Sequence, residues 1–164
     1  MAHEQFVLPN LVVGRADIAR LTREIEALED YLRQAALRKT SEQTPKLPKT
    51  SRVMDELTSS NSLNLLDAEE RKKLINSLKL IRQKAPVVHM SFSVDPSSAF
   101  IQKMTVWWRT NIDPYVLIET GLQPNIAIGS ILRTPNHQYD FSLRKRLQSQ
   151  KEVLIKMLEM PVES

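Results

Sequence analysis

The chain of 164 residues has a net charge of +4 and contains only 3 glycines beside 9 prolines. Loops that cradle phosphate groups depend on glycine, and the sequence has neither a Rossmann-type nor a Walker-type glycine motif, so its composition disfavours nucleotide-dependent enzymes. The chain has no cysteine, which excludes disulfide bonds and thiolate metal sites.

The first predicted element is a helix over residues 11–39, in which apolar residues recur at alternating spacings of three and four. We call this row the heptad stripe; its members are Ile18, Leu21, Ile25, Leu28 and Leu32. Charges of both signs surround it, and a stripe this narrow favours pairing with another helix over burial beneath a sheet. We therefore expect residues 1–39 to form a helix-pairing segment, either in a homodimer or with a partner. The alternative is that the helix folds back onto its own domain.

Residues 40–61 are predicted to be a linker. Pro45 and Pro48 interrupt the apolar pattern. Ser, Thr, Lys and Glu make up most of the other residues in the first half of this predicted linker. A short apolar group around Met54 and Leu57 is compatible with a single helical turn, which either docks or stays loose.

A second domain is predicted over residues 62–164. Asp67 and Glu70 form a capping box for a helix that Pro86 ends. Apolar and polar residues then alternate over 87–94, which predicts a strand, and Asp95-Pro96 opens another helix. Further strands are expected at 115–120, at 125–134 and at Tyr139, followed by a last helix over 142–160. This order, helix then β-α-β-β-α, predicts an α/β domain with a small mixed sheet packed with helices.

The sequence offers little for catalysis. The histidines, His3, His89 and His137, lie far apart and none stands in a metal-ligand spacing. We therefore predict no catalytic, cofactor-binding or metal-binding residues, no cofactor, and a chain that is not an enzyme.

Two features indicate binding of another protein. Trp107 and Trp108 point about 100° apart on a helix, so only one of them is centred on the core face; Trp108 fits that face, and Trp107 flanks it. Tryptophan is enriched at binding hot spots, which makes Trp107 a candidate anchor.

The last predicted helix is basic, because it contains Arg144, Lys145 and Arg146. These residues suit an acidic partner surface, and the alternative is that they form a solvated face.

One segment carries a recognisable pattern. A Pro-Asn segment leads into a strand with a glycine, and Asp-x-Ser-Leu-Arg-x-x-Leu then opens the last helix. The positions concerned are Pro124, Gly129, Asp140, Ser142, Arg144 and Leu147. This arrangement resembles the C-terminal signature of the delta subunit of F-type ATP synthases, which is called the oligomycin-sensitivity-conferring protein in mitochondria. The resemblance extends back through the strand at 87–94 and the helix that follows it.

The resemblance implies a peripheral-stalk, or stator, scaffold subunit whose C-terminal domain holds b-type stalk helices. Its implied partners are the b-type stalk subunit and the catalytic hexamer, and its implied place is the cytoplasmic side of the inner membrane, reached only through the complex. The chain itself has no run of the roughly 18 apolar residues that a membrane-spanning helix needs.

The departures from the family limit what is carried over. Gln123 stands where the family has aspartate, and Ile128 replaces the first of its two glycines. The N-terminal helical domain that grips the hexamer in that family has no match, and residues 11–39 stand in its place. Two alternatives remain: a free-standing coiled-coil adaptor or dimerisation protein that reuses a delta-like domain, and, less favoured, a basic nucleic-acid-binding protein. No nucleic acid is expected as a partner.

Overall fold

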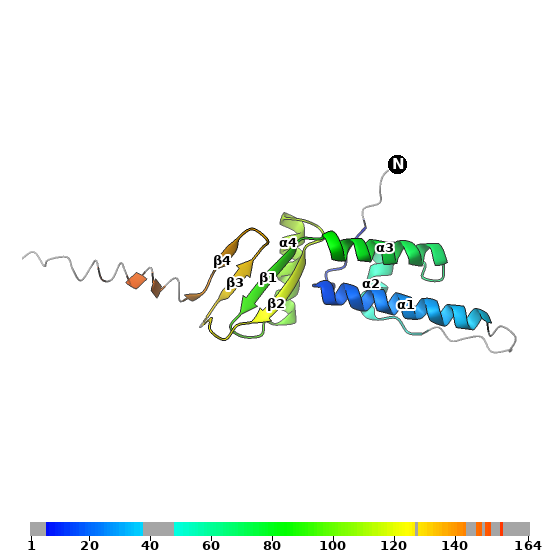
Figure 1. Ribbon diagram of the computed structural model, residues 1–164, viewed down its shortest axis with the longest axis horizontal. Helices are drawn as coiled ribbons and strands as arrows, with labels where there is room; N and C mark the ends of the chain where they lie inside the picture. Colours follow the sequence, from blue (N-terminus) through cyan, green and yellow to red (C-terminus); the bar gives the residue numbers. More distant parts are fainter. Residues whose placement is uncertain are drawn as a thin grey trace, which may run out of the picture. The chain divides into compact units, whose positions relative to one another are not determined.

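The computed structural model describes residues 6–37, 48–126, 128–143, 147–148, 150–151 and 155. Within these residues it contains four helices and a four-stranded mixed sheet (Figure 1), which confirms the predicted α/β class and the long N-terminal helix. The helices are α1 (Arg15–Leu37), α2 (Arg52–Ser60), α3 (Ala68–Lys84) and α4 (Ser98–Asn111). The strands are β1 (Val87–Phe92), β2 (Leu117–Leu122), β3 (Ser130–Arg133) and β4 (Gln138–Asp140).

The chain divides into two compact units that differ from the predicted domains. The first unit comprises residues 1–86 and 102–117, and the second comprises residues 87–101 and 118–164. The first is helical and contains α1, α2 and α3, whereas the second contains the sheet. No helix in the described part of the chain is long and apolar enough to cross a membrane.

The heptad stripe is buried inside the first unit. Ile18, Leu21 and Ile25 are fully buried, Leu28 is nearly so, and Leu32 is half-buried. Helix α1 contacts α3, whose own apolar positions are buried with those of α2. The structure thus matches the alternative in which the helix folds back, with α3 as a helix that α1 contacts, and pairing of the stripe with a helix of another chain stays a prediction.

Part of the predicted linker is a helix. Helix α2 occupies Arg52–Ser60, its N-cap is Ser51, and Met54 and Leu57 are buried. The linker prediction is thus wrong for these residues, because two apolar side chains three residues apart give α2 a buried face and Ser51 gives it a cap. The more polar stretch at 40–47 lies outside the described residues.

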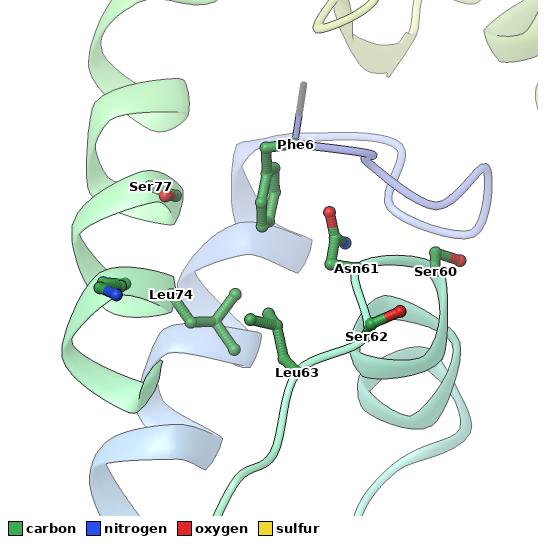
Figure 2. Close-up of a pocket in the computed structure, with 8 residues that line it drawn as sticks. Phe6, Ser60, Asn61, Ser62, Leu63, Leu74 and Ser77 are labelled. Carbon is green, nitrogen blue, oxygen red and sulfur yellow. The ribbon is translucent and has the colours of Figure 1, made fainter. Parts of the chain in front are cut away.

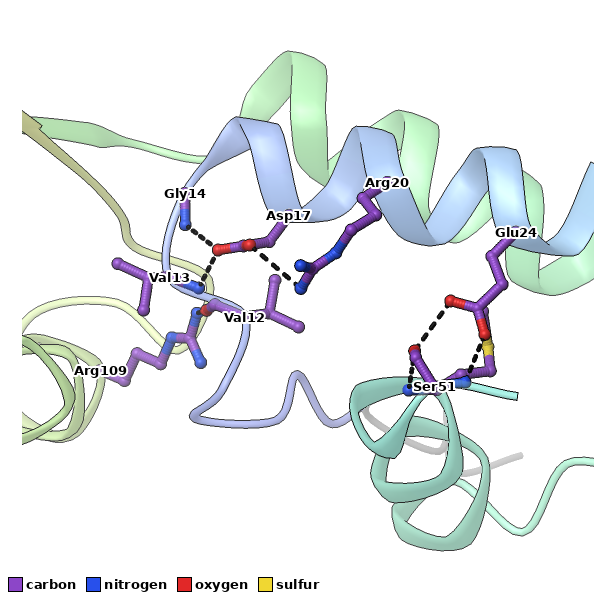
Figure 3. Close-up of polar contacts among 9 residues, drawn as sticks. Val12, Val13, Gly14, Asp17, Arg20, Glu24, Ser51 and Arg109 are labelled. Atoms are coloured by element: carbon purple, nitrogen blue, oxygen red, sulfur yellow. Dashed lines mark hydrogen bonds and ion pairs between the residues drawn. The ribbon is translucent and has the colours of Figure 1, made fainter. Parts of the chain in front are cut away.

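Glu24 fixes the start of α2 to α1. Its carboxylate accepts hydrogen bonds from the Ser51 backbone N–H at 2.6 Å and from the Ser51 hydroxyl at 2.8 Å (Figure 3). The Ser51 hydroxyl oxygen in turn accepts from the backbone N–H of Met54 at 3.3 Å. One half-buried carboxylate therefore orients the cap of the next helix.

We expect Glu24→Ala to lower the free energy of unfolding by about 2 kcal/mol, because hydrogen bonds to a charged group are lost and the cap is released. Glu26→Ala is the matched control, because Glu26 forms an ion pair with the exposed Lys79 at 3.8 Å, and such pairs contribute less than about 0.5 kcal/mol. Urea unfolding followed by circular dichroism measures both. Equal losses for the two variants would show that the Glu24–Ser51 contact does not stabilise the unit.

The sheet has the strand order β2-β1-β3-β4. Strand β1 pairs with β3 antiparallel, and β3 pairs with β4 antiparallel. The N–H of Leu117 donates to the carbonyl of Pro86, and that of Gln123 donates to the carbonyl of Phe92, so β2 advances in the same direction as β1. Helix α4 is the connection between these two parallel strands, as a β-α-β unit requires.

The strand predictions hold with shifted ends. In β1 the buried residues Val88, Met90 and Phe92 alternate with exposed or half-buried ones, as expected, but the strand stops at Phe92. The strand predicted at 115–120 occupies Leu117–Leu122, and the one predicted at 125–134 starts only at Ser130. The backbone just before Ser130 explains the late start, because Gly129 has φ +115°, which no extended strand adopts.

Candidate docking surface

Three aromatic rings stack along β4 at the edge of the sheet. His137, Tyr139 and Phe141 are each two residues apart and therefore share one face of the strand. Ring centroids are 6.0 Å apart for the first pair and 6.3 Å apart for the second, with interplanar angles of 20° and 16°. Tyr139 is 47% exposed and Phe141 63% exposed. We call these three residues the aromatic ladder.

The ladder continues the apolar face of the sheet to its edge. Tyr139 lies opposite Leu132, and Leu132 lies opposite Met90. Residues opposite each other in a sheet point to the same side, and Leu132 and Met90 are both buried. Leu143, which follows the ladder in sequence, is also partly exposed. The apolar surface is thus buried at the middle strands and reaches solvent at β4.

The junction that carries the ladder is tight at Gly129. A Cβ atom added there would lie 2.5 Å from the carbonyl oxygen of Phe141 and 2.8 Å from the Cα of Ser142. On either side of the glycine, the Leu143 N–H donates to the Ile128 carbonyl at 2.8 Å, and the Phe141 N–H donates to the Ser130 carbonyl at 2.9 Å. Only glycine combines the left-handed φ with this close approach.

Asp140 and Ser142 complete the same junction. The Ser142 backbone N–H donates to the Asp140 carboxylate at 2.8 Å, an Asx turn, and Ser142 is buried. The described residues from Leu143 to Ile155 are helical, in agreement with the predicted last helix. Three signature positions predicted from sequence, Gly129, Asp140 and Ser142, therefore meet in space and hold Phe141 between them.

The other predicted site residues are not part of this junction. Pro124 lies in the turn after β2, and Leu147 is an exposed helical residue. Arg144, Lys145 and Arg146 lie outside the described residues. Trp107 belongs to the first unit, where it is 52% exposed and packs edge-to-face on Trp108 with centroids 5.3 Å apart. Its exposure agrees with the prediction that it flanks the buried face of α4.

The described residues contain no group of three or more His, Asp or Glu side chains arranged to hold a metal ion. The Nδ1 atom of His89 lies 3.2 Å from a carboxylate oxygen of Glu119 on the exposed face of the sheet. His137 stacks on Tyr139. The ladder is suited to binding, because it presents aromatic ring faces and one phenol hydroxyl.

Sequence reasoning missed the ladder. The sequence predicts only a short strand at Tyr139, and Phe141 is a variable position in the Asp-x-Ser pattern that opens the last helix. The signal was present in the alternation His137-x-Tyr139-x-Phe141, which is the period of a strand with one aromatic face.

No protein-family model matches this chain, and none of the curated proteins matches it. The resemblance to the delta subunit therefore rests on the sequence positions described above.

Proposed function

We propose that the chain is a non-catalytic scaffold subunit of the peripheral-stalk type, which binds a helix of a b-type stalk subunit through the aromatic ladder. The observation that carries the proposal is the exposure of Tyr139 and Phe141 at a junction that Gly129 and Ser142 hold in place. Exposed aromatic rings on a rigid support are typical of protein-binding surfaces. The delta-like signature, which contains this junction, supplies the class of partner.

The spacing of the rings favours a helix as the bound element. Side chains four residues apart on one face of a helix are separated by roughly 6 Å along its axis. The ring centroids of the ladder are 6.0 and 6.3 Å apart, so successive apolar positions of an amphipathic helix match successive rings. The i and i+4 residues of such a helix would be its anchors on the rings.

Basic residues beyond the ladder extend the proposal. Arg144, Lys145 and Arg146 follow it in sequence and would meet acidic residues at the rim of the bound helix. Trp107 stays a candidate second anchor on the first unit. Contact with the catalytic hexamer is left out of the proposal, because the domain that makes it in the delta family has no match in this sequence.

The test is isothermal titration of the full chain with a synthetic peptide of the C-terminal helix of the b-type subunit from the same organism. Phe141→Ser removes a ring that is more exposed than that of Tyr139, and we expect an affinity loss of about 30-fold, corresponding to a hot-spot contribution of about 2 kcal/mol. The interaction is apolar at its centre and should persist at high salt, whereas nucleic-acid affinity falls steeply with salt.

Leu66→Ser is the matched control, because Leu66 is 59% exposed but belongs to the first unit. It should bind the peptide like the wild type. No heat with the wild-type chain would refute the docking function, and a folded Phe141→Ser variant with unchanged affinity would remove the ladder from it.

A further inference from the structure

Residues 6–12 form a segment of the first unit. Its backbone carbonyls accept hydrogen bonds from side chains that are distant in sequence. We call this segment the N-terminal strap. Asn61 follows α2, Arg109 lies near the end of α4, and Tyr115 follows α4. All three donate hydrogen bonds to carbonyls of the strap, although they are 54 to 109 positions away in sequence.

Asn61 and Tyr115 recognise the start of the strap. The Val7 N–H donates to Oδ1 of Asn61 at 2.7 Å, and Nδ2 of Asn61 donates to the Val7 carbonyl at 2.8 Å. This pair of bonds copies one rung of a β-ladder. The hydroxyl of Tyr115 donates to the Phe6 carbonyl at 2.9 Å. Because only backbone atoms are read, these contacts do not depend on which side chains the bound segment carries.

Arg109 recognises the rest of the strap. Its Nη1 donates to the carbonyls of Leu8 at 3.2 Å and Pro9 at 2.8 Å, and its Nη2 donates to the carbonyl of Val12 (Figure 3). Burial lowers the pKa of Arg109 to about 10, which leaves the guanidinium charged at neutral pH. The carbonyls of the strap thus solvate a partly buried cation, and the guanidinium would lose these acceptors if the strap left.

The side chains of the strap are only partly matched by the surface that receives them. Leu8 and Val12 are buried, but Phe6 borders two cavities of about 340 Å³ and 250 Å³. Figure 2 shows Phe6 facing Leu63 and Leu74 in the larger cavity, with Asn61 beside it. The second cavity is bordered by Leu80, Ile81 and Tyr115. Phe6 therefore borders one cavity of mixed lining, which also includes Ser62 and Lys73, and a smaller one that is mainly apolar.

We propose that Asn61, Arg109 and Tyr115, with the two cavities, form a receptor site for a short apolar peptide, and that the strap is the occupant the chain itself supplies. The occupant accepted in trans is a partner segment of the same chemistry as Phe6-Val7-Leu8-Pro9: an aromatic residue, an apolar residue two positions later, then proline. Proline suits the fourth carbonyl because it offers an acceptor and no N–H that would need a partner. The site lies in the first unit and uses no residue of the aromatic ladder, so it is independent of the proposed stalk function.

The test uses the full chain with Phe6→Ala, which weakens the strap and leaves all three receptor side chains in place. The probe is a fluorescein-labelled peptide of residues 4–13 of this chain, and fluorescence anisotropy measures its binding. We expect the variant to bind at least about tenfold more tightly than the wild type, in which the tethered strap competes at high effective concentration. Adding Asn61→Leu should reverse the gain, and a peptide with alanine in place of its phenylalanine should bind weakly.

A folded Phe6→Ala variant that binds the peptide no better than the wild type would overturn the proposal. Should that variant fail to fold, amide hydrogen exchange in the wild-type chain decides instead. Saturating peptide should speed exchange of the Val7 N–H as the strap is displaced, and an unchanged rate would contradict a displaceable strap. If the wild-type chain forms a dimer and the peptide dissociates it, the strap of a second copy fills the same site. That result would support the proposed receptor site.

Discussion

Replacing Ile25 by aspartate should unfold the helical unit. Ile25 is fully buried between α1 and the helices that cover it, and the variant would place a carboxylate there without a partner. Loss of the apolar side chain together with burial of a charge should cost about 4 kcal/mol or more, which is a large part of the stability of a small domain. Trp107 and Trp108 lie in this unit, so urea unfolding followed by tryptophan fluorescence measures the loss.

The matched control is Ala27→Asp, which adds the same charge two positions away on the exposed side of α1. It should cost well under about 1 kcal/mol, the size of a helix-propensity change. A result in which Ile25→Asp remains fully helical and only dissociates a dimer would instead assign the heptad stripe to an interface between chains.

Gly129→Ala should be the most damaging small substitution in the second unit. The alanine would need a φ of +115° and would bring its Cβ within 2.5 Å of the Phe141 carbonyl oxygen. Backbone strain of this kind costs roughly 1–3 kcal/mol, and the clash adds to it, so we expect a loss of about 3 kcal/mol or more. Because the clash displaces Phe141, binding of the stalk helix should weaken as well.

Gly121→Ala controls for the loss of a glycine in the same sheet. Its added Cβ would approach nothing closer than the Ser91 hydroxyl oxygen, at 3.9 Å, and its φ is not left-handed. We expect a change within about 0.5 kcal/mol. Thermal unfolding of the two variants compares them directly, and equal stability would show that the Gly129 junction tolerates a side chain.

Features set by neighbouring residues were predictable from the sequence. The Asp67 side chain caps α3 by accepting from the Glu69 N–H at 2.9 Å, although the Glu70 carboxylate accepts from the Asn64 N–H, so only the Asp67 half of the predicted capping box forms. Helix α3 ends at Lys84, just before Pro86. The alternation over β1 correctly identifies its buried face. These signals are local, because a cap or a strand period is decided within a few residues.

Features that depend on distant partners were not predictable in the same way. The heptad stripe has the same sequence pattern whether it packs on another chain or on α3. The sequence therefore left both partners open, and the structure shows the stripe buried within its own chain. The strap depends on hydrogen bonds such as that of Arg109 to Leu8, which join residues 101 positions apart. Of the candidate site, the signature residues Gly129, Asp140 and Ser142 were identified, but the ladder they support was not.

Co-migration of this chain with the ATP synthase is the most direct test of the proposed stalk-scaffold function. Membranes from cells that produce the tagged wild-type chain are solubilised, complexes are separated by native electrophoresis, and this chain is quantified by mass spectrometry against the b-type subunit. We predict a constant ratio of the two in the band with ATPase activity, and loss of the chain from that band for Phe141→Ser. A chain that migrates apart from every ATP synthase subunit while the complex stays intact would contradict the proposed function.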